Sequence, residues 1–456
     1  MDDEIFIPTS FFFIKYHHVQ KSPMDEKQLT IQRKLYALIL CSIVFMMVYN
    51  FTAWYISKLT DVPSFVFNFE NYIPFIPWSI IPYMTSGIFF CLVFFFCQNK
   101  EQLKVLTQRI LFVTVVAGIC FLLFPLKFSL PKPEINDPVL GYSFQFLKVF
   151  DSPFNQAPSL HIAYAFIFWS VFRNLKKGRS FVMLWLIILG ISTLTTYQHH
   201  FIDVITGSIL AHFSFIIFPY QKNNFLYRNF HIANLYFLSG WCIILIVFLA
   251  NQFIGETGLL FLWPGLMIIL IGYHYQKNDI FFLKNKAGHI PWIKKIFYIP
   301  YLLIYRIFWR FFRKNRTPLE ILPRLYISSR PDRESIQDFG INKATFVYDL
   351  SAEIEELSII KDTAVYHSFP LLDIGTFDSS ETQKLVTEIT EYYQQLPPDG
   401  KILIHCTMGF TRSSVIGILV IKNILSLPLT EAITMMKTHN KHAVIPTYLE
   451  DFLKKI

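Results

Sequence analysis

Long apolar runs decide what most of this chain can fold into. About eight of them are long enough to cross or nearly cross a bilayer, since a spanning helix needs roughly 20 apolar residues. Charged residues make up only 16% of the chain, against about a quarter in soluble domains. We therefore expect a multi-pass α-helical membrane domain. The runs centre near residues 35–57, 76–97, 107–126, 159–173, 180–197, 201–220, 232–250 and 256–275.

Basic residues gather in alternate loops between these runs. They are Lys27, Arg33, Lys34, Lys100, Lys104, Arg109, Arg173, Lys176, Lys177, Arg179, Lys222 and Arg228. The positive-inside rule then places both chain ends in the cytoplasm, with the loop 127–159 and the turn around His199 outside. These loops account for the net charge of +9, so we expect no nucleic-acid partner.

The chain changes character near Pro318, where charges become frequent and apolar runs shorten to strand length. We expect strands at RLYIS, ATFVYDL, AVYHSF and KILIHC. Helices are expected at residues 381–395, 413–425 and 429–437. This alternation predicts a small α/β domain. Before it, residues 292–314 mix basic and aromatic side chains, which favours an amphipathic helix on the cytoplasmic surface over a ninth span.

Four parts follow from these features. They are a cytoplasmic N-terminal segment at 1–34, a transmembrane domain at 35–280, a basic amphipathic interfacial linker at 281–316 and the α/β domain at 317–456.

The stretch KILIHCTMGFTRSS, residues 401–414, joins a strand to a helix through a cysteine loop. Cys406 and Arg412 are six residues apart, so the loop can point backbone N–H groups at one phosphate, and the following helix adds its dipole. This environment favours a thiolate at Cys406, which can attack phosphorus, while Arg412 binds two phosphate oxygens. The leaving oxygen needs a separate acid, and Asp373, in a loop after a predicted strand, is the best candidate.

Residues 320–456 resemble the dual-specificity branch of the tyrosine phosphatase superfamily through this strand, the HCxxGxxRS loop and the upstream acidic loop. The resemblance implies that Cys406 is the nucleophile and forms a phosphocysteine intermediate. It also implies that Arg412 holds the phosphate, that Asp373 is the general acid and that Ser413 helps the thiolate leave. The loop interior, which would bind phosphate, is Thr407, Met408, Gly409, Phe410 and Thr411. It lacks lysine and a second arginine, which favours a substrate with one phosphate, on protein or lipid.

Ionisable residues also occur at the ends of the apolar runs. His161 lies in FDSPFNQAPSLHIA, and His199, His200 and Asp203 lie in STLTTYQHHFIDVITG. Such residues are costly in a membrane and are functional by default. Asp203 is four residues after His199, so it can orient that imidazole for attack on phosphorus. A second histidine can protonate the departing oxygen.

Residues 80–220 resemble the type 2 phosphatidic acid phosphatase superfamily, whose six-helix core we expect here. PSLH matches the family's Pro-Ser-x-His, and Ser192, His199 and Asp203 match a second motif. The resemblance implies His199 as a nucleophile forming a phosphohistidine, Asp203 as its orienting group, His161 as general acid and Ser159 as a phosphate ligand. The FNxxPSLH form is most similar to the inositol phosphorylceramide synthase and sphingomyelin synthase branch.

The chain departs from that family at two places. Thr193 stands where the second motif has arginine, and the family's first motif is not intact, with Lys127 and Lys132 nearby as phosphate-binding candidates. His200 is an alternative nucleophile, because it reaches Asp203 at a spacing of three residues.

These readings favour a bifunctional membrane phosphatase. A histidine site at the outer face would hydrolyse or transfer a phosphoryl or phospho-head group of a lipid, and a cysteine site would hydrolyse phosphomonoesters in the cytoplasm. Two alternatives remain: an anchored phosphoprotein phosphatase with a sensing membrane domain, and a transporter with a regulatory soluble domain. We expect membrane lipids or lipid phosphates, or a phosphoprotein, as partners, with no cofactor and no metal. Fusions of these two modules resemble bacterial inner-membrane phosphatases, which implies that location.

Overall fold

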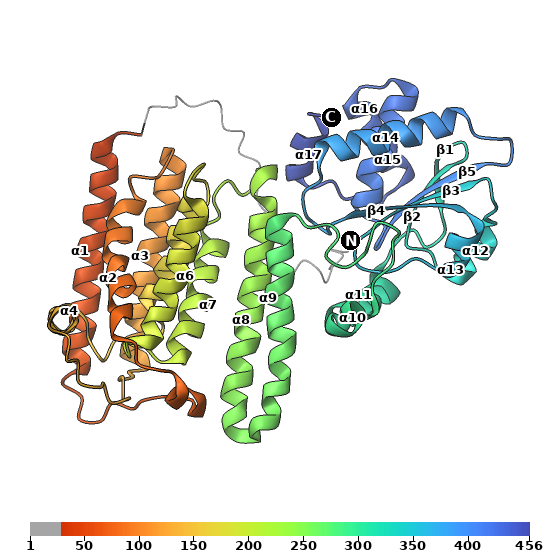
Figure 1. The fold of residues 1–456 in the computed structure, drawn as a ribbon. Coiled ribbons are helices and arrows are strands. Elements are labelled where there is room, and N and C mark those ends of the chain that lie inside the picture. The colour runs from red at the N-terminus through yellow and green to blue at the C-terminus, as the bar shows by residue number, and fades with distance from the viewer. Residues whose placement is uncertain (1–28) are drawn as a thin grey trace, which may run out of the picture. The chain divides into compact units, whose positions relative to one another are not determined.

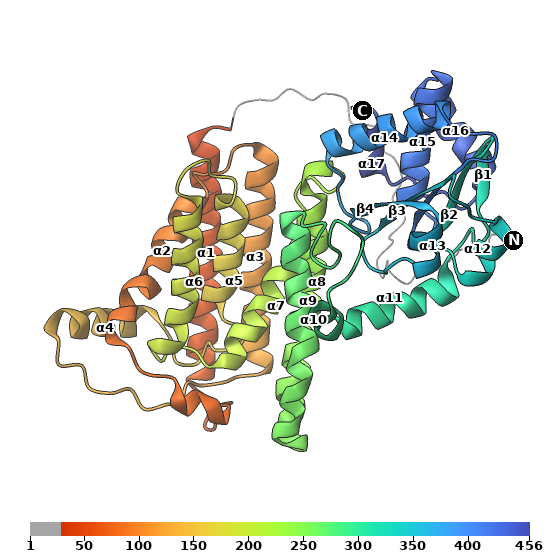
Figure 2. The same cartoon turned by 45° about the vertical axis from the view of Figure 1, so that its right-hand side comes forward.

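The computed structural model describes residues 29–456, which are drawn in Figure 1 and, turned, in Figure 2. The described residues form two compact units. One contains the residues up to Tyr220 together with Asn234–Ile269, and the other contains Gln221–Ala233 and Leu270–Ile456. The N-terminal segment predicted at 1–34 lies almost entirely outside the described residues.

The first unit is a bundle of helices. They are α1 (Ile31–Ile56), α2 (Ile80–Val93), α3 (Lys100–Leu123), α4 (Pro138–Phe150), α5 (Leu160–Phe172), α6 (Arg179–Thr195) and α7 (Phe201–Ile217), with most of α8 (Arg228–Ile254) and part of α9 (Leu262–Lys277). Within residues 29–456, four helices are long and apolar enough to cross a membrane: Ile31–Ile56, Lys100–Leu123, Phe225–Asn251 and Gly258–Lys277. Four shorter apolar helices also match predicted runs: Pro77–Val93, Leu160–Phe172, Arg179–Thr195 and Phe201–Ile217. The helix α4 was not predicted.

Helix α5 lies at the centre of this bundle, packed against α2, α3, α6 and α7. Ser159 caps its first turn by accepting the N–H of Ile162, which starts the helix at the predicted PSLH motif. Gly207 lets α7 come close, because a Cβ there would lie 2.5 Å from the carbonyl oxygen of Ser159. The two histidine motifs therefore meet at one end of the bundle.

The second unit contains an α/β domain with a five-stranded mixed sheet in the order β1-β2-β5-β3-β4. Its strands are β1 (Leu319–Leu322), β2 (Leu325–Ser329), β3 (Thr345–Ser351), β4 (Val365–Leu371) and β5 (Lys401–Cys406). Only β1 is antiparallel to its neighbour. The four predicted strands overlap β2 to β5, whereas the short edge strand β1 was not predicted.

Helices cover both faces of the sheet (Figure 2). The helices α14 (Ser379–Gln394), α15 (Arg412–Leu425), α16 (Leu429–His439) and α17 (Thr447–Leu453) share one hydrophobic core with the strands. The short helices α12 (Arg333–Phe339) and α13 (Ser358–Thr363) contribute to a smaller core that includes Val347 and Leu403. Helices α10 (Trp292–Phe297) and α11 (Ile299–Phe312) occupy the stretch predicted to be amphipathic.

Candidate functional site

The cysteine loop joins the central strand to a helix. Cys406 is the last residue of β5 and is buried, and α15 begins six residues later. The N–H of Gly409 donates to the Cys406 sulfur at 3.3 Å, and the hydroxyl of Ser413 lies 3.4 Å from it. Gly409 has φ +81°, and a Cβ there would lie 2.7 Å from the carbonyl oxygen of Lys314 and 2.9 Å from the nitrogen of Ser329. Only glycine fits, and the sulfur receives the polar partners that a thiolate needs.

The remaining loop residues are held from outside the loop. The carbonyl oxygens of Thr407, Met408, Phe410 and Thr411 accept hydrogen bonds from backbone N–H groups of other segments or of α15, at 2.8 to 3.3 Å. With these oxygens facing outward, the loop is suited to turn N–H groups toward an anion above the sulfur, as in anion-binding nests.

Arg412 is buried beside the loop. Its Nη1 donates to both carboxylate oxygens of Glu353, at 3.0 and 3.1 Å, and to the carbonyl oxygen of Leu371 at 2.8 Å. Burial alone would lower the pKa of Arg412, but the carboxylates of Glu353 and Asp373 raise it well above its ordinary value. Its Nη2 makes no hydrogen bond within the described residues and lies 3.4 Å from Asp373. That nitrogen is therefore available to a phosphate oxygen.

Glu353 was not identified from the sequence. It lies just after β3, is buried, and accepts a hydrogen bond from the hydroxyl of Thr407 at 2.6 Å as well as those from Arg412. The carboxylate thus ties the guanidinium to the loop and fixes its orientation. The only signal for it was a short acidic run after a predicted strand.

Asp373 lies on the loop after β4, with its carboxylate 3.4 Å from Nη2 of Arg412. Its carboxylate is 15% exposed and accepts a hydrogen bond from the hydroxyl of Tyr305 at 3.3 Å. The hydroxyl of Tyr275 donates to its backbone carbonyl at 3.1 Å. The structure therefore brings a carboxyl group, an arginine and a thiol together. The two tyrosines were not predicted.

Asp349, Glu356 and His405 form a buried group behind the loop, with ligand atoms within 4.8 Å of one another. Such a group could hold a metal ion by geometry. Lys284 already lies 2.7 Å from Asp349, and Arg330 lies 3.7 Å from Glu356. These cations balance the two carboxylates, so the group is best explained as a buried ion-pair network.

In the helical unit, the predicted histidines also meet. Nδ1 of His199 lies 3.2 Å from Oδ2 of Asp203, and the rings of His161 and His199 are 5.7 Å apart between centroids. Ser159 is buried, and its N–H donates to the carbonyl oxygen of Asp203 at 3.0 Å. Within residues 29–456, the Nε2 atom of His199 makes no hydrogen bond. An imidazole oriented by a carboxylate and facing a second histidine is suited to phosphoryl transfer.

His200 has different surroundings. Its Nδ1 lies 2.9 Å from Oε2 of Glu70, and its Nε2 accepts the N–H of Ser129 at 3.3 Å. Its ring also stacks on Phe128, with centroids 4.4 Å apart. Both ring nitrogens are engaged, so this geometry favours His199 over His200 as the nucleophile. Glu70 was missed because 130 residues separate it from His200.

Asp151 adds a third carboxylate to the histidine site. It accepts hydrogen bonds from the hydroxyls of Tyr49 and Tyr83, and the Tyr83 ring stacks on His161 with centroids 4.3 Å apart. The hydroxyl of Tyr83 also lies 3.5 Å from Nδ1 of His161. These residues hold the predicted general acid, and they were not assigned a role from the sequence.

The two predicted lysines do not contact the histidines directly, although Lys132 interacts electrostatically with Asp151. Lys127 and Lys132 are exposed, and among the described residues neither makes a hydrogen bond or ion pair with the histidines. Lys132 lies over the ring of Phe128 at 5.5 Å. Thr193, in the place of the motif arginine, is buried, and its carbonyl oxygen accepts the N–H of His199.

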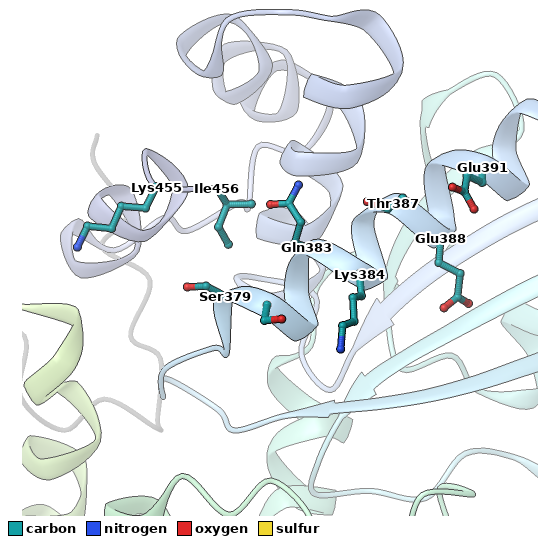
Figure 3. Close-up of a pocket in the computed structure, with 9 residues that line it drawn as sticks. Ser379, Gln383, Lys384, Thr387, Glu388, Glu391, Lys455 and Ile456 are labelled. Atoms are coloured by element: carbon teal, nitrogen blue, oxygen red, sulfur yellow. The ribbon is translucent and has the colours of Figure 1, made fainter.

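Figure 3 shows a shallow pocket elsewhere on the α/β domain, along α14 and the last two residues. Ser379, Lys384 and Glu388 are among its lining residues. It contains none of the predicted site residues.

Comparisons with known proteins found one matching family model and several similar solved structures. Residues 78–217 match the model of the PAP2 superfamily. Three similar solved structures are the phosphatase Tk-PTP in its active form, human DUSP28 and the human tyrosine phosphatase-like serine/threonine/tyrosine-interacting protein. Their identities to this chain are 20%, 15% and 16%. They cover 30%, 31% and 31% of this chain and 95%, 94% and 95% of their own, with TM-scores of 0.27, 0.26 and 0.26. The predicted resemblance to the type 2 phosphatidic acid phosphatase superfamily is confirmed over residues 78–217.

Proposed function

We propose that this chain is a bifunctional membrane phosphatase. One site uses His199 to take a phosphoryl or phospho-head group from a lipid, and the other uses Cys406 to hydrolyse a phosphomonoester. The match of residues 78–217 to the PAP2 superfamily supports a phosphatase of some kind. The single observation that carries the cysteine reaction is the sulfur of Cys406, which has the N–H of Gly409 and the hydroxyl of Ser413 within 3.4 Å.

At the cysteine site, the thiolate of Cys406 attacks phosphorus and the bond from phosphorus to the leaving oxygen breaks. Asp373 gives that oxygen its proton, so an alcohol departs and a phosphocysteine remains. In the second step a water oxygen attacks phosphorus, and the ionised Asp373 takes a proton from that water. The bond between phosphorus and sulfur breaks, so phosphate and the thiolate of Cys406 are released. Arg412 binds phosphate oxygens throughout, and Ser413 hydrogen-bonds the departing sulfur.

At the histidine site, Nε2 of His199 attacks phosphorus while Asp203 holds the opposite side of the ring. His161 protonates the departing oxygen, and water or a lipid hydroxyl then takes the group from the phosphohistidine. Ser159, at the beginning of α5, would bind phosphate with the helix dipole. Water as acceptor gives a hydrolase, and a lipid hydroxyl gives a head-group transferase.

The proposal includes the predicted arrangement of the chain. The eight apolar helices would span the membrane, residues 292–314 of the linker would lie on the cytoplasmic surface and residues 317–456 would form the cysteine phosphatase. The two sites would face opposite sides of a bacterial inner membrane. The loop charges support this orientation, and a cytoplasmic location would keep Cys406 reduced.

Phosphate release by purified detergent-solubilised protein tests the proposal. Phosphatidic acid, phosphatidylglycerol phosphate and an aryl phosphate are offered to the wild type, Cys406→Ser and His199→Ala. Each substitution is expected to remove the release that its own site supplies, so the two variants should differ in which substrates they still hydrolyse. If Cys406→Ser removes all release, the histidine site is not a phosphatase, and head-group exchange between lipids becomes the next measurement. If neither substitution lowers release, the proposed function is wrong.

A further inference from the structure

The acid loop of the cysteine site, residues 372–377, is held by the ends of two apolar helices. Nε of Arg228, the first residue of α8, donates to the carbonyl oxygen of Ile374 at 2.9 Å. The next residue, Asn229, accepts the N–H of Thr376 at 2.8 Å. From α9, the hydroxyl of Tyr275 donates to the carbonyl oxygen of Asp373. All these residues belong to the same compact unit.

Both of these helices are long and apolar enough to cross a membrane. Arg228 is the first residue of α8, and the last turns of α9 contain Tyr273, Tyr275 and Lys277. Tyrosine and basic residues at helix ends are typical of the boundary between hydrocarbon and water. If these two helices cross a bilayer, their ends would hold the loop that carries the general acid at the bilayer surface.

Helix α11 also contacts the acid loop, and its other face is apolar and exposed. Tyr305 faces inward and bonds Asp373, and the indole of Trp309 donates to the carbonyl oxygen of Arg330 at 2.8 Å. On the opposite side, Leu303 and Phe311 are 54% and 67% exposed. An apolar face of this kind, flanked by basic residues, binds the surface of an anionic membrane.

Those basic residues are Arg306 and Arg310, both exposed on α11. Their charge complements a lipid that carries a phosphate. The loop interior adds Phe410, which is partly exposed, and offers no cation beyond Arg412 for a second phosphate.

We propose that the substrate of the cysteine site is a lipid phosphomonoester lying in the bilayer, and not a soluble phosphoprotein. This inference rests on the proposed cysteine-phosphatase function. The phosphate of such a lipid would have to reach only the acid loop, which the ends of α8 and α9 would hold near the membrane surface. The sulfur of Cys406 takes the phosphoryl group, Asp373 protonates the oxygen of the leaving lipid alcohol, and water releases phosphate in the second step.

Full-length protein in phosphatidylcholine vesicles tests this inference. The His199→Ala form is used so that the histidine site does not contribute, and the double variant with Cys406→Ser gives the background. Phosphate release is measured from phosphatidic acid in the same vesicles, from a soluble phosphotyrosine peptide at equal total phosphate, and from an aryl phosphate. We expect Cys406-dependent release from the lipid to be at least about 10-fold faster than from the peptide, a difference of about 1.4 kcal/mol in barrier.

A second variant separates surface binding from chemistry. Leu303→Glu places a charge on the exposed face of α11 and is expected to slow lipid hydrolysis several-fold while leaving aryl phosphate hydrolysis unchanged. Gln394→Glu, an exposed residue at the end of α14, adds the same charge and should change neither rate. Faster hydrolysis of the peptide than of the lipid, or equal loss of both rates in Leu303→Glu, overturns the inference. Absence of Cys406-dependent release from all three substrates instead overturns the proposed function.

Discussion

Lys284→Met is expected to destabilise the α/β domain strongly, although Lys284 precedes the domain boundary predicted from the sequence. Its side chain is fully buried, with Nζ 2.7 Å from Oδ2 of Asp349 and 2.5 Å from the carbonyl oxygen of Ser351. Methionine fills a similar space without charge, so Asp349 remains buried and loses its counter-ion. Removing one member of a buried ion pair costs about 3–5 kcal/mol.

Pulse proteolysis of the detergent-solubilised protein in urea measures this cost. With a slope of about 2 kcal/mol per M urea, the unfolding midpoint of the domain should fall by about 1.5–2.5 M. Lys286→Met is the matched control, because Lys286 is exposed two residues along the same segment. A midpoint for Lys284→Met within about 0.5 M of the control would refute the reasoning, since it corresponds to only about 1 kcal/mol.

The effect of Lys284→Met should also depend on pH. Burial alone would raise the pKa of Asp349, but Lys284 and then His405 lower it below the ordinary value of 3.8. A carboxyl whose folded pKa is lowered stabilises the protein above its unfolded pKa, and this stability is lost as the pH falls through the folded value. Without Lys284, burial would instead raise the pKa of Asp349. The difference in stability between wild type and variant should therefore be largest at neutral pH or above. It should shrink as the pH falls through the raised pKa of the variant and go on shrinking down to the lowered pKa of the wild type.

Four further substitutions test the two sites. Asp373→Asn should slow hydrolysis of an alkyl phosphate by about 10²–10⁴-fold and change the rate for a nitrophenyl phosphate far less, because a good leaving group needs no acid; equal slowing of both would contradict its role. Gly409→Ala should abolish Cys406-dependent release, since strain at positive φ costs about 1–3 kcal/mol and the added Cβ meets backbone atoms; wild-type rates would show that the loop can open. His199→Gln should abolish lipid phosphate release at the histidine site, whereas Glu70→Gln, which acts on His200, should lower thermal stability and retain activity; the reverse result would make His200 the nucleophile.

Local pattern was enough to predict most elements, and it selected residues that the structure brings close together at the two candidate sites. The apolar runs had to be helices because only continuous backbone hydrogen bonding suits a membrane interior. The loop from Cys406 to Arg412 was readable because its chemistry depends on residues close together in the sequence. The same holds for His199 and Asp203, which are one helical turn apart.

The sequence could not identify the hydrogen-bond partners that are distant along the chain and meet only in the fold. Glu353 lies 59 residues before Arg412, and Tyr305 lies 68 before Asp373. Elements without strong periodicity were also missed, such as β1, which has only four residues at a sheet edge. Glu70 left a usable signal, because a carboxylate near a membrane boundary needs a partner. The identity of that partner, His200, required the fold.

The connection between the two sites constrains what the chain can do with one lipid. Helix α7 begins next to His199 and has 17 residues, a length of about 26 Å at 1.5 Å per residue, close to the roughly 30 Å of a bilayer core. Residues 218–227 then lead to α8, whose first residues, Arg228 and Asn229, bond the acid loop of Asp373. In the orientation proposed from the loop charges, His199 lies at the outer face and Cys406 in the cytoplasm, so the phosphates of the two reactions would belong to different leaflets. A lipid that meets both sites must change leaflets in between, so substrate confined to one leaflet of a vesicle should supply only one of the two reactions.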